Sequence, residues 1–170
     1  MIRTILLTLG LIFGTAANAD LSITFDEGAP KDRFDISNRG TCDLDAFEIT
    51  IDLSTSQGAL FFDVTKTGKG IEVYQPFELV SAKKRIQDAR IPTDGDTMVV
   101  LDVARLNKGE TISFTIDVDD TISQRGITVS GSEMEGSSAR IAVGETLYTA
   151  LFDQKSIATV SGLDCHSEQT

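Results

Sequence analysis

Apolar and polar residues alternate in short runs along most of this chain, and no other feature constrains its fold as strongly. The alternation is clear at Leu21, Ile23 and Phe25, and it returns at Phe47 and Ile49, with polar residues between them. Successive side chains of a β-strand point to opposite faces of a sheet, so this pattern predicts strands with one buried and one solvated face. The chain is therefore expected to be all-β.

Further runs of this kind follow at short intervals and are separated by Gly, Asp, Asn and Ser. They lie at residues 59–64, 71–80, 99–103, 112–118, 127–129, 141–143, 147–152 and 157–160. Pro76 interrupts one of them, which indicates an edge strand or a bulge. The turn signal Asn107-Lys108-Gly109 predicts a hairpin between 99–103 and 112–118. About nine or ten antiparallel strands at this spacing are typical of an immunoglobulin-like β-sandwich.

Residues 81–90 have a helix-forming composition but no wide apolar stripe, so a helix, a loop and an irregular edge strand all stay open. This segment carries the basic cluster Lys83-Lys84-Arg85, with Arg90 nearby. Such a cluster can contact a sulfated or acidic polysaccharide, or the acidic face of a neighbouring copy. It can equally be a solvated loop, or an edge strand that its charges protect.

The first nineteen residues have the features of a secretory signal peptide. Arg3 supplies a positive start, residues 4–15 are almost wholly apolar, and Ala17-Asn18-Ala19 is a small-x-small cleavage site. We therefore expect a signal peptide at 1–19 and a single domain at 20–170, exported to the periplasm or the medium. No segment approaches the roughly 20 apolar residues of a membrane helix, so no membrane span is expected.

The chain carries 26 acidic and 15 basic residues, which gives a formal net charge of −11. A surface this acidic repels the phosphate backbone of nucleic acids and concentrates cations around the protein. Nucleic acid is thus excluded as a partner, and divalent cations are the natural small ligands.

The sequence contains only two cysteines, Cys42 and Cys165. Because an exported protein folds under oxidising conditions, we expect a disulfide bond between them. Such a bond would tie the C-terminal tail to the start of the domain.

The segment from Phe114 to Thr121 contains the most unusual local pattern. Alternation buries Phe114, Ile116 and Val118 and places Asp117 and Asp119 together on the opposite face, with Asp120 where the strand ends. Three carboxylates this close repel one another, and a calcium ion with six to eight oxygen ligands relieves that repulsion. The competing interpretation is a solvated acidic strand end, since the chain has no EF-hand loop.

Other acidic residues also lie near predicted strand ends, and the loops at one end of a sandwich cluster in space. Asp26 and Glu27 follow the first strand and are the preferred additional calcium ligands. The remaining strand-end acids are Asp43, Asp45, Asp63, Asp94 and Asp96.

The sequence contains no recognisable set of catalytic residues. The only histidine, His166, lies next to Cys165 in the tail, where it is poorly placed to act as a base. One histidine and two cysteines also do not form a zinc ligand set. The chain is therefore predicted not to be an enzyme, although a carboxylate pair of the glycosidase type stays open among so many acids.

Several segments resemble the aggregation-factor core family. The likeness lies in the strand and turn patterns of Phe34–Leu44, Phe47–Ser54 and Gly58–Asp63, and it extends through Thr111–Thr121 and Ile127–Glu133. The family is named for the protein core of the sponge aggregation factor, an extracellular proteoglycan of calcium-dependent cell adhesion, and it has short exported bacterial members. The resemblance implies an exported β domain with a calcium-dependent role. In contrast to the sponge proteins, this chain is a lone domain without an Asn-x-Ser/Thr sequon.

These features together predict a non-catalytic adhesion or interaction domain, monomeric or weakly associating, with calcium as its candidate cofactor. Its partner is expected to be an extracellular or envelope protein or a polysaccharide. The alternative is a carbohydrate-active protein, either a binding module or a hydrolase with a carboxylate pair, which a cleft with two facing acids would favour. A third possibility is an envelope protein whose partner adds a strand to an open sheet edge.

Overall fold

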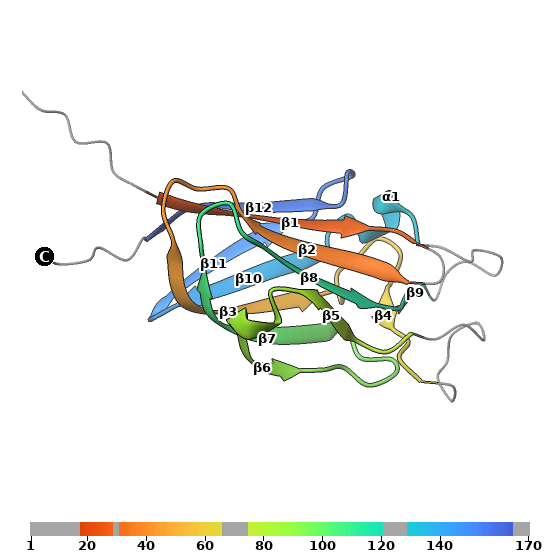
Figure 1. Ribbon diagram of the computed structural model, residues 1–170. Coiled ribbons are helices and arrows are strands. Elements are labelled where there is room, and N and C mark those ends of the chain that lie inside the picture. Colours follow the sequence, from red (N-terminus) through yellow and green to blue (C-terminus); the bar gives the residue numbers. More distant parts are fainter. Residues whose placement is uncertain (1–17, 29–30, 66–74, 121–128, 165–170) are drawn as a thin grey trace, which may run out of the picture.

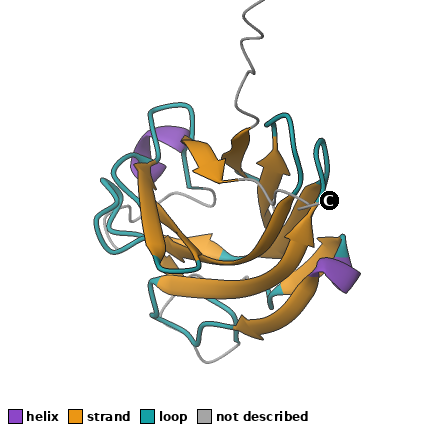
Figure 2. Ribbon diagram, turned by 90° about the vertical axis from the view of Figure 1, so that its left-hand side faces the viewer, coloured by secondary structure: helices purple, strands orange, loops and turns teal. Residues whose placement is uncertain are grey.

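The computed structural model describes residues 18–28, 31–65, 75–120 and 129–164. In these residues the chain forms two antiparallel sheets of five strands each, and the sheets pack face to face (Figures 1 and 2). One hydrophobic core lies between the sheets and takes side chains from both. The prediction of an all-β sandwich is confirmed. None of the helices in the described residues is long and apolar enough to cross a membrane.

The first sheet has the strand order β12-β1-β2-β8-β5. Its strands are β12 (Ile157–Asp164), β1 (Asn18–Asp26), β2 (Asp32–Asn38), β8 (Thr111–Ile116) and β5 (Glu78–Ser81). The second sheet has the order β11-β10-β3-β7-β6. Its strands are β11 (Thr146–Leu151), β10 (Ser138–Val143), β3 (Leu44–Asp52), β7 (Met98–Leu106) and β6 (Ile86–Arg90).

Two very short strands, β4 (Phe61–Phe62) and β9 (Val118–Asp119), pair at one end of the sandwich. In the part of the chain that the structure describes, the helical elements are the 3₁₀ turn η1 (Lys83–Arg85) and the single turn α1 (Gly131–Met134). β2 was not predicted as a separate strand, although Phe34 and Ile36 alternate within it and are fully buried.

The aromatic side chains of the core come from both halves of the chain. The rings of Phe34 and Phe114 stack on adjacent strands with their centroids 5.1 Å apart. Phe25 lies 5.0 Å from Phe34, and Phe152 approaches the same ring edge-on. Such aromatic pairs stabilise the folded state beyond the burial of their area. The predicted alternation thus places the phenylalanines inside.

The turn at Asn107–Gly109 does not close a hairpin, contrary to the sequence-based prediction. β7 pairs with β3 and β6 in the second sheet, whereas β8 pairs with β2 and β5 in the first. The Gly109 N–H donates to the Asn38 carbonyl over 2.9 Å, and the Asn38 N–H donates to Glu110 over 3.0 Å. The residues of a turn determine its local conformation. The pairing of the two strands that it joins depends instead on how each strand packs against the rest of the core. The turn therefore carries the chain from one sheet to the other.

Among the interpretations left open for residues 81–90, the irregular edge strand is correct. β5 ends at Ser81, η1 follows, and β6 then forms an edge of the second sheet. Pro76 precedes β5, which is an edge strand with a register shift between Leu79 and Ser81. In the basic cluster, the Arg85 Nε donates to the Glu110 carboxylate over 2.8 Å.

β1 begins two residues before the predicted cleavage point. Asn18 pairs with Asp164, and Ala19 pairs with Leu163 and is fully buried. The Asn18 carbonyl also accepts the Thr41 N–H over 2.9 Å. Residues 18 and 19 therefore belong to the sheet, although they were assigned to the signal peptide.

We predict that a chain starting at Asn18 is more stable than one starting at Asp20. The shorter chain loses a buried methyl group and two paired residues, which we expect to cost about 1 to 2 kcal/mol. Urea unfolding of the two purified chains measures this difference. Equal midpoints and slopes would show that residues 18 and 19 do not stabilise the sheet.

Candidate metal centre

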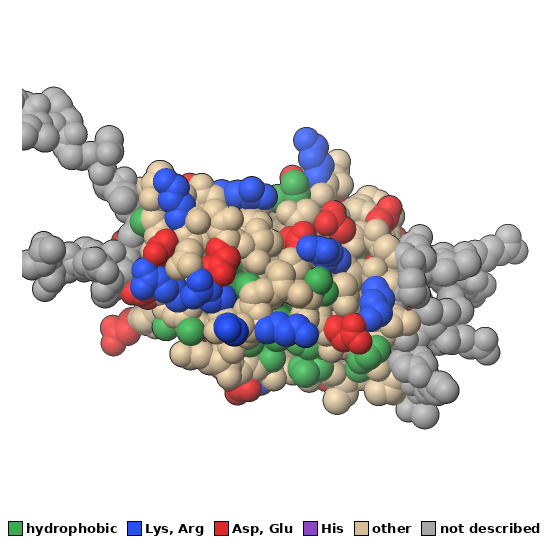
Figure 3. All heavy atoms as spheres, viewed as in Figure 1, with side chains coloured by type: hydrophobic (Ala, Val, Ile, Leu, Met, Phe, Trp, Pro, Cys, Tyr) green, Lys and Arg blue, Asp and Glu red, His purple; other side chains and the backbone are tan. Residues whose placement is uncertain are grey.

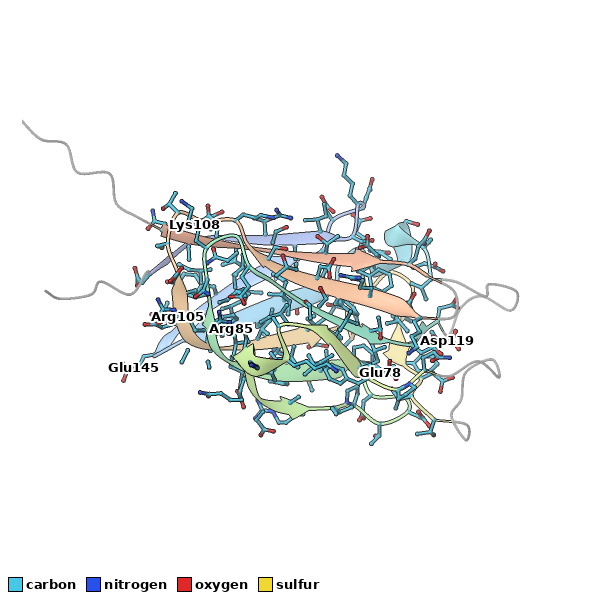
Figure 4. The ribbon with its side chains drawn as sticks, viewed as in Figure 1. Glu78, Arg85, Arg105, Lys108, Asp119 and Glu145 are labelled. Atoms are coloured by element: carbon cyan, nitrogen blue, oxygen red, sulfur yellow. The ribbon has the colours of Figure 1, made fainter. Side chains whose placement is uncertain are left out.

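Four aspartates gather at the end of the sandwich where β4 pairs with β9. Asp32 opens β2, Asp63 follows β4, Asp117 connects β8 to β9, and Asp119 ends β9. The pKa of Asp117 responds to the charges of the other three, which places all four carboxylates within electrostatic range. We call these four residues the acidic end cluster; Asp119 marks its place in Figure 4.

The pairing of β4 with β9 brings Asp63 next to Asp117. Phe62 is opposite Val118 in this antiparallel pair, and the Asp63 N–H donates to the Asp117 carbonyl over 3.1 Å. Directly opposed residues of an antiparallel pair project to the same face, with Cβ atoms about 5 Å apart. The two carboxylates therefore come from neighbouring positions on two strands that are distant in sequence.

Asp32 is held in place by the backbone. Its side chain is only 3% exposed, its Oδ2 accepts the Val118 N–H over 2.9 Å, and its Oδ1 accepts the Gly28 N–H over 3.1 Å. Burial raises the pKa of Asp32 to about 6, although both hydrogen bonds favour the charged form. Asp32 therefore anchors the start of β2 to β9 and to the connection that precedes it.

Asp117 has the most strongly perturbed carboxyl group of the cluster. Burial, followed by repulsion from Asp32, Asp63 and Asp119, raises the pKa of Asp117 to about 8. A carboxyl group with such a pKa holds a proton at neutral pH unless a cation replaces it. This position is thus suited either to a proton or to a metal ion.

Asp63 carries an unpartnered oxygen inside the cluster. The residue is 3% exposed, and its Oδ1 is buried without any hydrogen-bond partner in the described part of the chain. Burial raises the pKa of Asp63, and the charges of Asp94 and Asp119 raise it further. A buried polar atom without a partner costs about 1 to 3 kcal/mol, so this oxygen is the least satisfied polar atom of the cluster.

Two of the five predicted metal ligands, Asp117 and Asp119, lie in the cluster. Asp120 follows directly, and its N–H donates to the Asp119 Oδ1 over 2.8 Å. Glu27 is near enough for its charge to raise the pKa of Asp32. Asp26 is exposed at the end of β1 and, with Glu27, lines a separate shallow depression that also includes Ser156.

Sequence reasoning missed Asp32 and did not single out Asp63 from the other strand-end acids. The sequence did offer a signal for each residue. Asp63 follows the apolar run at residues 60–62, and Asp32 precedes the alternating residues Phe34 and Ile36. Neither signal indicates that β4 pairs with β9.

The remaining strand-end acids have structural partners. The Asp94 carboxylate accepts the N–H groups of Val64 and Thr65, and the Thr65 hydroxyl lowers its pKa. Asp96 accepts the N–H of Thr93 over 2.8 Å. Asp43 is at the other end of the sandwich, where Arg105 donates to it over 2.6 Å (Figure 4). These carboxylates cap turns or pair with cations.

The cluster is not a preassembled ligand set. Within the described ranges, no group of three or more His, Cys, Asp or Glu side chains is positioned to hold a metal ion together. The four carboxylates affect one another electrostatically, but they would have to turn toward a common centre to bind a cation. Such a site is expected to bind calcium weakly, because binding must also order its ligands.

Cys42 does not carry a free thiol, and Cys165 lies outside the described residues. The loop before Cys42 contacts the start of β1, because the Thr41 N–H donates to Asn18, which pairs with Asp164 at the end of β12. The residue after Asp164 is Cys165, so this arrangement favours the predicted bond. The bond stays a prediction; non-reducing peptide mapping should find the two cysteine peptides linked.

One face of the molecule carries charges of both signs. On the face seen in Figure 3, lysine and arginine side chains are interspersed with acidic ones. Ion pairs such as Lys31 with Glu78, at 2.6 Å, and Arg33 with Asp35, at 2.8 Å, account for part of this mixture. The acidic end cluster therefore contrasts with a face of mixed charge.

A second group of acids lies on the outer face of the other sheet. Glu48, Asp102 and Asp88 are direct neighbours across β3, β7 and β6, and all three line a shallow depression of about 390 Å³. Arg90 on β6 pairs with Glu48. Like charges opposite one another destabilise a sheet, and this arginine offsets part of that cost.

No known protein family matches the chain, and neither curated proteins nor solved structures similar to it were found. The resemblance to the aggregation-factor core family, the immunoglobulin-like type of the sandwich and the export of the chain all stay proposals.

Proposed function

We propose that this protein is an exported, non-catalytic interaction domain that calcium stabilises at the acidic end cluster. The observation that carries the proposal is the unpartnered Oδ1 of Asp63, which is buried among three further aspartates. A buried carboxylate oxygen without a donor is costly, and a cation would satisfy it and relieve the repulsion of its neighbours.

Calcium suits this site better than a transition metal does. The cluster offers only carboxylate oxygens, which hard cations prefer, and the flexible coordination of calcium tolerates ligands from several segments. Asp63, Asp117 and Asp119 are the proposed ligands, with Asp120 and Glu27 as candidates to complete the shell. Asp32 is a positioning residue, because backbone N–H groups already bind both of its oxygens.

Binding at this place would rigidify the end of the sandwich. Asp63 follows β4 and Asp119 ends β9, so one cation would hold together segments that the small β4–β9 pair also joins. A partner that contacts this end, such as an extracellular or envelope protein or a polysaccharide, would then meet an ordered surface. This is the calcium-dependent role that the resemblance to the aggregation-factor core family implies.

Calorimetric titration with calcium at physiological ionic strength tests the proposal. We expect saturable binding with a Kd of about 10⁻⁴ to 10⁻³ M, the range of exported modules. The double variant Asp117→Asn with Asp119→Asn should lose saturable binding. The matched control is Asp88→Asn with Asp102→Asn, which removes the same charge from another surface and should bind as the wild type does.

The absence of saturable heat at calcium concentrations up to about 5 mM would refute calcium binding in this range. If both double variants lost the binding heat to the same extent, the heat would come from the overall negative charge of the protein and not from this cluster. Either result would reduce the acidic end cluster to a site that holds protons.

A carbohydrate-active protein is the second candidate function, and the depression lined by Glu48, Asp88 and Asp102 favours it. Directly opposed positions have Cβ atoms about 5 Å apart, a spacing compatible with the carboxylate pair of a retaining glycosidase. Release of reducing ends from soluble polysaccharides, lost in Glu48→Gln and Asp102→Asn, would support this candidate. Activity that survives both substitutions would exclude this carboxylate pair.

A further inference from the structure

β11 is an edge strand, and the polar groups along its outer side have no partner in the described residues. Within those residues it pairs only with β10, through a two-residue turn at Gly144 and Glu145. The pair that flanks such a turn exchanges hydrogen bonds, and bonded and non-bonded pairs then alternate. The backbone N–H and C=O groups of Leu147, Thr149 and Leu151 therefore point away from β10.

Two of the three side chains that β11 presents on the outer face are apolar and exposed, with Thr149 between them. Leu147 and Leu151 are each 63% exposed, more than any other large apolar side chain among the described residues. They lie on the outer face of the second sheet, in register with Ala142 and Ser138 of β10. An edge with exposed leucines and free backbone groups is suited to pairing with another strand.

β11 also lacks the protection that the other edges have. Charges, prolines and bulges normally prevent one edge from pairing with another. β5 and β6 each carry a register shift and charged residues, and β12 ends in Asp164 beside a register shift. The segment Thr146–Leu151 contains no charge and no proline, and its register with β10 is continuous.

Acidic residues bracket this neutral strand. Glu145 is exposed in the turn before β11, and Asp153 is exposed two residues after it. Within the described ranges no ion pair joins either carboxylate to a cation. Glu145 and Asp119 are far apart in Figure 4, so the turn that precedes β11 is separate from the acidic end cluster.

The bracketing charges decide what can bind. Suppose that β11 of a second copy paired antiparallel with β11 of the first, so that Leu147 of each copy lay opposite Leu151 of the other. Glu145 of each copy would then lie opposite Asp153 of the other, and two acids would face each other at both ends of the pair. Like charges at opposed positions are destabilising, and a chain of net charge −11 repels its own copy in general. A strand with basic residues at both ends would instead complement the two acids.

We propose that β11 is a docking edge for an extended segment of a partner protein, with alternating apolar residues between lysines or arginines. The partner strand would receive and donate backbone hydrogen bonds at Leu147, Thr149 and Leu151. Its apolar side chains would cover the two exposed leucines. This proposal goes beyond the calcium-binding role and does not depend on it.

Synthetic nine-residue peptides test the proposal. In the first peptide, threonine and valine alternate between two terminal lysines, in the order that places valines opposite Leu147 and Leu151. In the second peptide, glutamates replace the two lysines. The third peptide is the lysine peptide with every second backbone amide methylated. We expect the lysine peptide to shift the NMR amide signals of β11 and to bind about fivefold or more tightly than the glutamate peptide at low salt. Methylation should abolish the shifts.

The protein variant Leu147→Lys with Leu151→Lys should repel the lysine peptide while its unfolding midpoint stays near that of the wild type. Because both leucines are exposed, a folding defect is not expected. Absence of shifts, equal binding of the lysine and glutamate peptides, or shifts elsewhere would overturn the proposal. The proposal would also be overturned if the wild-type protein dimerised without any peptide and this variant did not. The strand that pairs with β11 would then belong to a second copy.

Discussion

In the presence of a chelator, the domain is expected to lose stability as the pH rises from about 5 to about 9. The folded-state pKa of Asp117 is about 8 and that of Asp32 is about 6, whereas the ordinary pKa of an aspartate is 3.8. The folded state therefore binds more protons than the unfolded state between these values. The stability that the two protonated carboxyls contribute is present at low pH and is lost as the pH rises through their folded pKa values.

We expect the loss to be of the order of 3 kcal/mol, since one pKa unit corresponds to about 1.4 kcal/mol and the coupled groups share the effect. Urea unfolding at a series of pH values measures it. Asp117→Asn should flatten the dependence, because the amide does not ionise, and the exposed control Asp88→Asn should leave it unchanged. Constant or rising stability across this range would contradict the assignment of raised pKa values to the cluster.

Asp32→Ala should destabilise the domain by about 3 kcal/mol, because it leaves two backbone donors without an acceptor. The Val118 and Gly28 N–H groups both donate to this carboxylate, and the side chain is 3% exposed. Asp32→Asn retains one acceptor oxygen and should lose less. The folded-state pKa of Asp32 is about 6, so its carboxyl group is mostly uncharged at pH 5. The free energy of unfolding of the variants at pH 5 therefore reports the loss of the hydrogen bonds without the loss of a charge.

The matched control is Asp88→Ala, which removes an exposed carboxylate from the edge strand β6. It should change stability by less than about 0.5 kcal/mol. If Asp32→Ala were no more costly than this control, Asp32 would not anchor β2 to β9.

Alternation predicted the long central strands well because each of them has one buried and one outward face. Ile23, Ile49 and Leu101 are inside as expected, and the polar residues between them face outward. The pairing of strands could not be obtained in the same way. The turn after Leu106 resembles a hairpin turn, but β7 and β8 belong to different sheets.

The candidate site was predictable only as far as it is local. Asp117 and Asp119 share a face because they are two residues apart in an extended segment, which a sequence displays directly. Asp63 joins them through the pairing of two strands of only two residues each, and Asp32 joins them through its bond to Val118. Both contacts are long-range, and strands this short leave no periodic signal.

Thermal unfolding with calcium and with chelator, at equal ionic strength and pH 8, is the most direct test of calcium binding at the acidic end cluster. A cation that binds only the folded state must raise the midpoint, by about 4 °C when calcium is at ten times its Kd. The rise should vanish in Asp117→Asn with Asp119→Asn and persist in Asp88→Asn with Asp102→Asn. No rise beyond the effect of ionic strength, or the same rise in both double variants, would contradict calcium binding by this cluster.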